Sequence, residues 1–423
     1  MNTTPAPNPM LRVLSIRDFR LLWFAGSISV LGSQFSMIAM PWLVLQLTGD
    51  PLVLGLVMAL AGIPRAAFIL VGGVITDRFS PRGILLLCDL INFVMTGLAA
   101  LLIFAGLLQI WMLYVFSLVS GLVSGFVIPA ANSITPALVP AEDLQAGNSI
   151  TMGSSQLAGF LGPALAGILI GAYAQSTFGV AIAFGVDSLS FAISAFALWL
   201  MRGGRRLLAE TASVREPFWA SIRQAAGYLW HHAGLKFMFV IMAATNFFFT
   251  GPLLVGIPVL ADQRLPEGAR AFGFLMSAYA AGNLAGFILA GVLPKPSGRS
   301  FSRFVLLLLF AFGAVLASFG WITLTWIDFG LILFLGVGNG YLGLVIFTWI
   351  QQRTPREMLG RVISMVMLAS LGLVPLSQAL SGAITRWNLT GLFALGGSLI
   401  LLTALWAVFQ PALASLSSEM TGN

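Results

Sequence analysis

Apolar residues form long runs in this chain, and short polar or Gly- and Pro-containing segments separate them. Roughly 20 helical residues cross the hydrocarbon core of a bilayer, and each of these runs reaches that length. The pattern therefore predicts an all-α integral membrane protein with twelve transmembrane helices. The predicted spans are Phe19–Gln46, Leu52–Thr76, Gly83–Gly106, Trp111–Ala131, Asn148–Ala172, Phe178–Met201, Phe237–Leu260, Phe272–Leu293, Phe304–Leu324, Phe329–Ile350, Val362–Thr385 and Leu389–Phe409.

The composition supports a membrane protein. Of the 423 residues, 58% are hydrophobic and 8% are charged, compared with about 25% charged residues in an average soluble domain. So few charges cannot cover the water-facing surface of a soluble protein of this size, which excludes a soluble multidomain protein. The single cysteine, Cys88, excludes an intrachain disulfide framework and a cysteine-based metal cluster.

The basic residues are distributed unequally between the two sides of the predicted membrane. With twelve spans, seventeen of the 21 Lys and Arg residues fall on the side of the N-terminus, and only Arg264, Arg270 and Arg386 fall on the other. The positive-inside rule makes the crowded side cytoplasmic, so we expect both termini in the cytoplasm. The net charge of +7 is thereby explained by topology, and we expect no nucleic-acid partner.

Two six-helix halves are expected on either side of a polar, Arg-rich segment. The predicted parts are an N-terminal bundle with its cytoplasmic tail (1–201), a linker ending in an interfacial helix (202–236), a C-terminal bundle (237–410) and a cytoplasmic tail (411–423). Within the linker, the adjacent His231 and His232 are either a metal-binding or pH-sensing pair, or simply solvated, and we expect the latter.

The second half repeats the first. An offset of 215 aligns Pro140, Glu142 and Leu144 with Pro355, Glu357 and Leu359, both sets in predicted cytoplasmic loops. Since each half has six spans, the repeat keeps its orientation in the membrane. Such parallel repeats, related by an axis along the membrane normal, occur in one large class of secondary transporters.

A turn between the second and third spans carries a family resemblance. The segment Gly72–Arg82 reads GGVITDRFSPR, which resembles the signature of the major facilitator superfamily. The segments Asp18–Trp23, Ala39–Leu43, Leu47–Leu52 and Val139–Leu144 look like those of its drug and siderophore exporter branch, which includes macrolide-efflux and enterobactin exporters. The resemblance implies a twelve-helix transporter without enzymatic activity, and leaves the substrate open.

The resemblance implies a cytoplasmic gate at this turn. In the family the turn holds the two halves together while the cavity faces outward, which would be the role of Asp77 here. The alternative is that the arginines of the turn only fix the topology. The residues assigned to the gate motif, including those of the second copy, are Gly73, Asp77, Arg78, Arg82, Glu357 and Arg361.

The fifth span resembles the glycine-proline motif of antiporters in this superfamily. The residues that carry this resemblance are Gly159, Gly162, Pro163 and Gly167. Small residues permit close helix packing, and the proline removes one backbone hydrogen bond, which favours a bend. The fourth span departs from the family pattern, because Ser117 stands where many proton-coupled drug antiporters carry an arginine.

Three ionisable residues lie deep within the predicted spans: Arg65, Asp89 and Asp187. Placing such a group there costs about 2.5–3.5 kcal/mol on insertion scales, which makes each a functional candidate. We expect Arg65 to line the central path and to hold an anionic group or a coupling carboxylate; the alternative is a structural ion pair. An offset of 218 aligns Arg65 with Asn283, which is also polar and in mid-span.

The two carboxylates have structural alternatives. A carboxylate in a low-dielectric interior can carry a proton, so Asp187 and Asp89 are candidates for coupling transport to protons. The family resemblance instead places their helices outside the cavity. This favours buried hydrogen bonding for Asp187, and pairing with Arg78 or Arg82 for Asp89.

Uncharged polar residues at mid-span, together with Trp42 and neighbouring phenylalanines, suggest an apolar cavity with scattered hydrogen-bonding groups. The four candidates for lining the substrate cavity are Gln34, Gln156, Asn246 and Asn339. Such a cavity suits bulky amphiphilic molecules better than sugars or small ions.

These observations predict a secondary active transporter that exports amphiphilic small molecules (drug, macrolide or siderophore type) by alternating access, as a proton antiporter. The chain contains no nucleotide-binding signature, so ATP is not expected as the direct energy source. We expect no cofactor or metal, a monomer surrounded by lipid, and a bacterial inner membrane location. The alternatives are a lipid or lysophospholipid flippase of the same fold, a receptor without flux, and a membrane enzyme.

Overall fold

The structure is a computed structural model that describes residues 8–203, 223, 227–293, 299–354, 362–363, 365–367 and 370–410. Within these ranges, the side chains of some helical residues, among them Gly73, Asp77 and Arg78, lie outside the description. Every regular element in the described ranges is helical, which confirms the all-α prediction. The longer α-helices are α2 (Arg17–Thr48), α3 (Pro51–Arg78), α4 (Pro81–Phe104), α5 (Ile110–Leu138), α6 (Leu144–Ala172), α7 (Phe178–Leu200), α9 (Ala233–Gly251), α11 (Ala269–Val292), α12 (Arg299–Ser318), α13 (Thr325–Arg353), α15 (Val374–Trp387) and α16 (Leu389–Val408).

The expectation of twelve spans agrees with this set. Eleven helical stretches in the described part are long and apolar enough to cross a membrane, and the shorter apolar stretch Ser302–Ser318 of α12 lies where the ninth of the twelve spans is predicted. Many large apolar side chains on these helices are exposed, among them Leu101, Phe104 and Leu307. Exposed apolar faces of this kind are what a helix in contact with lipid tails requires, because lipid is as apolar as a protein core.

Two helices differ from their predicted form. The stretch predicted as Phe237–Leu260 is interrupted: α9 is followed by a π-helical turn, Pro252–Gly256, and then by the short helix α10 (Ile257–Gln263). Pro252 lacks an N–H group and therefore disturbs the backbone ladder. The second difference is α12, which ends at Ser318 although its apolar run continues to Leu324. Hydropathy cannot detect either change, since both segments remain apolar.

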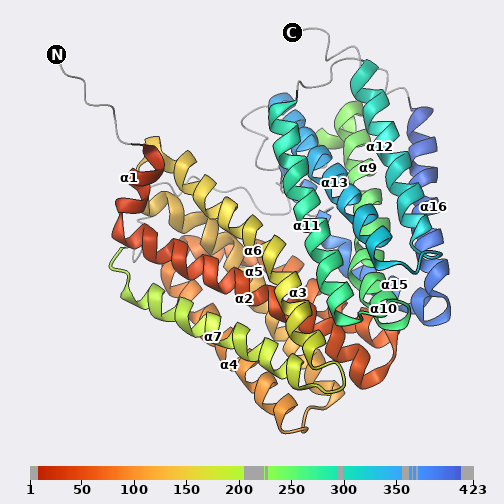
Figure 1. The fold of residues 1–423 in the computed structure, drawn as a ribbon. Helices are drawn as coiled ribbons and strands as arrows, with labels where there is room; N and C mark the ends of the chain where they lie inside the picture. The colour runs from red at the N-terminus through yellow and green to blue at the C-terminus, as the bar shows by residue number, and fades with distance from the viewer. Residues whose placement is uncertain are drawn as a thin grey trace. The chain divides into compact units, whose positions relative to one another are not determined.

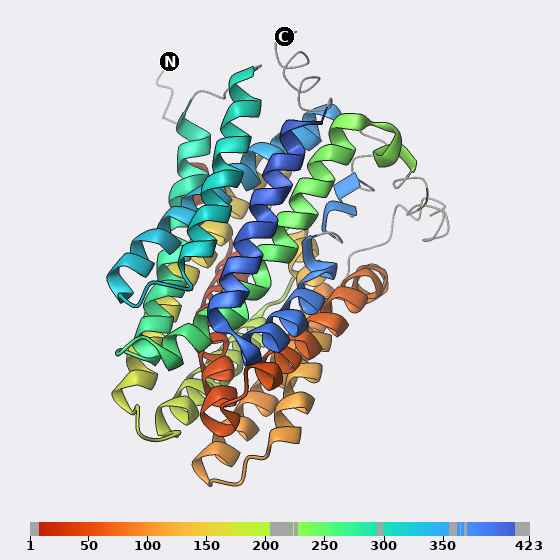
Figure 2. The ribbon, with the colours of Figure 1, turned by 90° about the vertical axis from the view of Figure 1, so that its right-hand side faces the viewer.

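The chain forms two compact units, which are described separately. Unit 1 comprises Met1–Leu47 with Ile63–Thr211, and unit 2 comprises Thr48–Gly62 with Ala212–Asn423, so the first part of α3 belongs to unit 2. The units repeat one packing pattern, because α4 packs along α7 in unit 1 and α12 packs along α16 in unit 2. Figure 2 shows α16 between α12 and α9. These pairs are the third and sixth spans of each half, as a six-span repeat predicts.

Among the described helices of unit 2, α11 and α13 pack against each other along most of their length. A methyl group at Gly282 would lie 2.1 Å from the Leu333 carbonyl oxygen, and one at Gly286 would lie 2.2 Å from that of Val337. Gly336 and Gly340 approach α11 equally closely. Glycines four residues apart on both helices thus bring the two backbones into contact, the arrangement that small residues permit in membranes.

The N-terminal segment is fixed to unit 1 by a short helix, α1 (Pro9–Ser15). Arg12 donates from Nε to Asp143 Oδ2 at 2.7 Å, and its Nη2 contacts Asp143 Oδ1. This fork-to-carboxylate geometry is the strong form of an ion pair, and Asp143 raises the pKa of the Arg12 guanidinium by hydrogen bonding and by its charge. Val13, Phe19 and Val139 form a buried cluster that joins α1 to α2 and to the end of α5.

Candidate functional site

Arg65 lies near the middle of α3 and is partly buried. Its guanidinium makes no hydrogen bond or ion pair with any residue that the structure describes. A guanidinium has five N–H donors and stays charged, so a position within a membrane helix without a counter-ion is costly. The alternative of a structural ion pair is therefore not seen among the described residues, and the donors of Arg65 are available for a ligand.

Asn283, the repeat mate of Arg65, has a different environment. Its side-chain amide donates to Asn339 Oδ1 at 3.0 Å, between the closely packed helices α11 and α13. The contact places two predicted site residues together. Both side chains are partly buried, and each has hydrogen-bonding capacity beyond this one bond.

Asp187 lies in α7 and is 2% exposed. The hydroxyl of Ser36 in α2 donates to its Oδ2, and the hydroxyl of Ser190 lies 3.5 Å from its Oδ1. The helices approach closely because Gly32 of α2 lies beside this group: a methyl there would come within 2.0 Å of Ser190 Oγ. The carboxylate is thus enclosed by hydroxyls, which is the buried hydrogen bonding expected for it.

Asp89 in α4 is 7% exposed and accepts a hydrogen bond from Ser194 of α7 at 2.5 Å. This described bond goes to a hydroxyl, whereas an arginine partner was expected. Asp89 and Asp187 both connect α7 to a neighbouring helix by way of serine hydroxyls, so they form a polar seam along α7 within unit 1.

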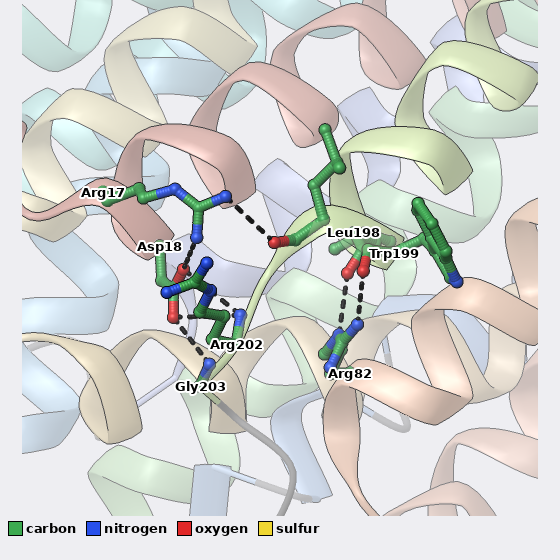
Figure 3. A network of polar contacts seen from close by, with 8 residues as sticks. Arg17, Asp18, Arg82, Leu198, Trp199, Arg202 and Gly203 are labelled. Carbon is green, nitrogen blue, oxygen red and sulfur yellow. Dashed lines mark hydrogen bonds and ion pairs between the residues drawn. The ribbon is translucent and has the colours of Figure 1, made fainter.

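Arg82 contacts the end of α7. Its Nε donates to the Leu198 carbonyl and its Nη2 to the Trp199 carbonyl, both at 2.7 Å (Figure 3). The last carbonyls of a helix have no partner within the helix, and a cation beside them also interacts favourably with the helix dipole. Within unit 1, Arg82 therefore caps α7.

Two further residues secure the same helix end. Arg17 donates to the Leu200 carbonyl at 3.3 Å, and Asp18 accepts from the backbone N–H of Gly203 at 2.6 Å (Figure 3). The segment that leaves α7 is thereby fixed on both its carbonyls and its N–H groups. The other residues assigned to the gate motif lie outside the description. Glu357 and Arg361 are not among the described residues, and for Gly73, Asp77 and Arg78 only the backbone is described.

The glycine-proline motif lies within α6, where Gly162, Pro163 and Gly167 are buried. A methyl group at Gly162 would lie 2.4 Å from Cβ of Gln34, so α2 and α6 pack closely at this point. Gly159 has open space in place of a contact. The structure thus brings the motif together with Gln34, a residue predicted to line the cavity.

The remaining polar candidates are partly buried. Asn246 donates to the Met242 carbonyl at 2.9 Å within α9, and Gln156 lies in α6. Several buried polar atoms have no partner, including Trp42 Nε1 and Gln46 Oε1 in α2 and Thr245 Oγ1 beside Asn246 in α9. Trp42 and Gln46 lie one turn apart on α2, so they present a donor and an acceptor side by side.

A cavity that was not predicted lies in unit 2, where α3 begins and α15 ends. It measures about 520 Å³, and an ion pair of 3.5 Å between Arg386 Nε and Asp50 Oδ2 lies at its wall. Arg264 also lines it, held by the Gly320 carbonyl and by Thr390 Oγ1 at 2.8 Å. Arg264 and Arg386 are two of the three basic residues that the sequence places on the side of the membrane opposite the N-terminus.

Asp328, in the first turn of α13, was also missed. Asp328 is 0% exposed, and neither of its carboxylate oxygens has a hydrogen-bond partner. In the sequence it falls in a short polar break, which indicated a loop. Only the packing around α13 reveals that it is buried, and no local pattern could have shown this.

The histidine pair is exposed at the end of the linker. Each ring nitrogen Nδ1 lies near a carbonyl one turn earlier: His231 near Gly227, at 2.6 Å, and His232 near Tyr228, at 2.8 Å. Among the described residues, no group of three or more His, Cys, Asp or Glu side chains is arranged to hold a metal.

Comparisons of sequence agree with one another. A family model described as Major Facilitator Superfamily matches residues 22–374. The enterobactin exporter EntS of Escherichia coli O1:K1 / APEC is 28% identical over 357 residues, which cover 81% of this chain and 79% of that relative. The enterobactin exporter EntS of Shigella boydii serotype 4 is 27% identical over 357 residues, with the same shares covered.

Solved structures show the same fold at low identity. A mutant of the nucleoside transporter NupG superposes with a TM-score of 0.72 at 11% identity, covering 96% of this chain and all (100%) of that one. A bacterial homolog of the human lysosomal transporter Spinster, inward-facing and unoccupied, gives a TM-score of 0.66 at 16% identity, with 98% of each chain covered. Similarity at this level establishes the architecture and leaves the cargo undetermined.

Proposed function

The chain belongs to the Major Facilitator Superfamily, and from this premise we propose that it exports amphiphilic small molecules by alternating access, in exchange for protons. The relatives that support export are enterobactin exporters. The cargo is of the drug, macrolide or siderophore type, and it carries an anionic group.

The observation that carries this proposal is the free guanidinium of Arg65. It lies midway along a membrane helix and has no described partner. An arginine in such a place recognises carboxylate, phosphate or a similar anion through paired N–H donors. An apolar path with one such cation favours a molecule with a large apolar body and an acidic group.

The orientation follows from charge. The side of the membrane that holds seventeen of the 21 Lys and Arg residues is the cytoplasmic side, and both termini lie on that side of a bacterial inner membrane. The 202–236 segment links the 1–201 and 237–410 bundles there, and the protein acts as a monomer in lipid without catalysing a reaction.

Asp187 and Asp89 have structural roles in this proposal. Their carboxylates are occupied by serine hydroxyls that join α7 to its neighbours. A group that must bind and release protons during each cycle needs changing surroundings, whereas these lie inside one unit. We assign the coupling to groups other than this pair.

Transport by the purified chain in proteoliposomes tests the proposal. The vesicles are offered labelled enterobactin, an uncharged macrolide or a labelled lysophospholipid, with and without a proton gradient. We expect gradient-dependent accumulation of enterobactin in protein-containing vesicles only. Movement of lysophospholipid alone would indicate a flippase, and no movement of any compound under either condition would contradict a transport function.

A further inference from the structure

Asp328 is the most anomalous polar group in the described part of the chain. Its side chain is completely enclosed, and both oxygens lack a hydrogen bond. Buried polar groups in proteins are almost always paired, so an unpaired one requires an explanation. An ionised carboxylate in such a place is strongly disfavoured, and a buried acid without a counter-ion takes up a proton instead.

A hydrogen bond between an exposed acid and a hydroxyl lies one helical turn before Asp328. Glu267, in the loop before α11, is exposed, and its Oε2 accepts a hydrogen bond from the hydroxyl of Thr325. Thr325 is 8% exposed and precedes Asp328 by three residues, which puts the two side chains on one helix face. The exposed acid is bonded to the hydroxyl of Thr325, and the buried acid lies one turn further along the same helix.

No cation of the surrounding elements is available to Asp328 in the described contacts. On α11, which packs along α13, the charged residue is Arg270, exposed in the first turn. On α12 the basic residues, Arg299 and Arg303, lie at the end remote from α13's first turn. Arg264 is occupied by Gly320 and Thr390, and α13 itself has Arg353 at its far end. Among the described residues, Asp328 therefore has no cation as a neutralising partner.

We propose that Asp328 is the proton-binding site of unit 2 and that Glu267 and Thr325 conduct the proton to it. This inference rests on the proposed function, in which the loop that holds Glu267 lies on the outer side of the membrane. A proton from the outer water passes to Glu267 and then, through the Thr325 hydroxyl, to Asp328. When the surroundings of α13 change during the cycle, Asp328 releases the proton into the interior of unit 2. An exporter driven by an inward proton gradient needs such an outward-facing acceptor.

Two transport assays on the full chain in proteoliposomes separate proton coupling from substrate binding. Counterflow exchanges labelled for unlabelled enterobactin at equal pH and requires no net proton movement. Accumulation under a proton gradient requires it. We expect Asp328→Asn to reduce accumulation by about tenfold or more. Counterflow should stay within about twofold of the wild type. Asp328→Glu should restore part of the accumulation, and Glu267→Gln should slow it.

Asp187→Asn is the matched control, since Asp187 is equally buried but enclosed by hydroxyls; it should accumulate enterobactin as the wild type does. Gradient-driven accumulation by Asp328→Asn at the wild-type level would overturn the proposal. So would the loss of both activities, because Asp328 would then serve folding or substrate binding. A wild-type chain inactive in both assays would instead contradict the proposed function, and the proton site with it.

Infrared spectroscopy supplies a readout that needs no substrate. In difference spectra after a pH jump, the wild type should show the carbonyl band of a carboxylic acid that is absent in Asp328→Asn and present in Asp187→Asn. An unchanged band in Asp328→Asn would contradict proton binding at this residue.

Discussion

Asp187 in unit 1 and Asp328 in unit 2 are both enclosed carboxylates in membrane helices, at 2% and 0% exposure, yet their surroundings differ. Hydroxyls of Ser36 and Ser190 lie against the oxygens of Asp187, whereas both oxygens of Asp328 are unpaired. Burial alone therefore does not identify a functional group in a membrane protein. Hydrogen bonds to a buried carboxylate indicate a structural role, and their absence leaves room for a proton or a ligand.

The largest effect is expected when the two acids are replaced by leucine. Asp187→Leu leaves the Ser36 hydroxyl without its acceptor, which costs about 1–3 kcal/mol of folding free energy. Asp328→Leu removes a carboxylate that has no partner, so stability should be unchanged or higher while gradient-driven transport is lost. Thermal unfolding of the purified variants in detergent measures the difference. A lower melting temperature for Asp328→Leu than for Asp187→Leu would reverse the comparison.

A glycine substitution tests the enclosure of Asp187 without changing its charge. Gly32→Ala places a methyl group 2.0 Å from Ser190 Oγ and 3.1 Å from Asp187 Oδ1, so α2 and α7 must separate or the hydroxyl must rotate away. Overpacking of this kind costs about 1–3 kcal/mol. Gly26→Ala on the same helix is the control, because nothing lies within 4 Å of the added group. Equal melting temperatures for the two variants would mean that α2 and α7 do not pack closely around Asp187.

Arg82 extends the comparison to a cation whose described partners are the carbonyls of Leu198 and Trp199. Arg82→Ala leaves these carbonyls without that donor and should lower stability by about 1–3 kcal/mol. Arg82→Lys can restore only one of the two bonds, so its stability should lie between those of the wild type and Arg82→Ala. Limited proteolysis near residue 203, together with thermal unfolding, measures the effect. Wild-type behaviour of Arg82→Ala would show that the cap does not secure α7.

The smallest effect is expected at the N-terminal ion pair. The side chain of Arg12 is 44% exposed although Asp143 is 2% exposed, so water and salt weaken the interaction. Arg12→Ala should release α1 to proteases while leaving the melting temperature nearly unchanged. Asn8→Ala, which removes a capping bond of the same helix, serves as a comparison. A large fall in melting temperature would show that α1 is part of the core.

Much of the fold could be predicted from sequence, because the length and hydropathy of each span are local properties. Phe178–Met201 and Leu389–Phe409 were predicted to within one residue of α7 and α16. The turn at Pro252 and the early end of α12 could not be predicted, since tertiary contacts decide them. Gly320, for example, is held by Arg264 from a distant part of unit 2.

The candidate site was predicted less completely. A charge inside an apolar run is visible in the sequence, so Arg65, Asp89 and Asp187 could be found, and the structure separates them by their partners. Asp328 could not be found, because an acid at the end of a span resembles a loop residue until neighbouring helices enclose it. The roles of Asp77 and Glu357 remain predictions from the family resemblance.

Arg65 provides the most direct test of the account, which requires an anionic cargo on a path through the membrane. Initial counterflow rates of labelled enterobactin and of an uncharged macrolide are compared in the wild type, Arg65→Lys and Arg65→Ala. A charge-assisted hydrogen bond contributes about 1.5–3 kcal/mol, so Arg65→Ala should slow enterobactin roughly tenfold or more and leave the uncharged macrolide little changed. Arg65→Lys should be intermediate. Wild-type rates for enterobactin in Arg65→Ala would contradict the account.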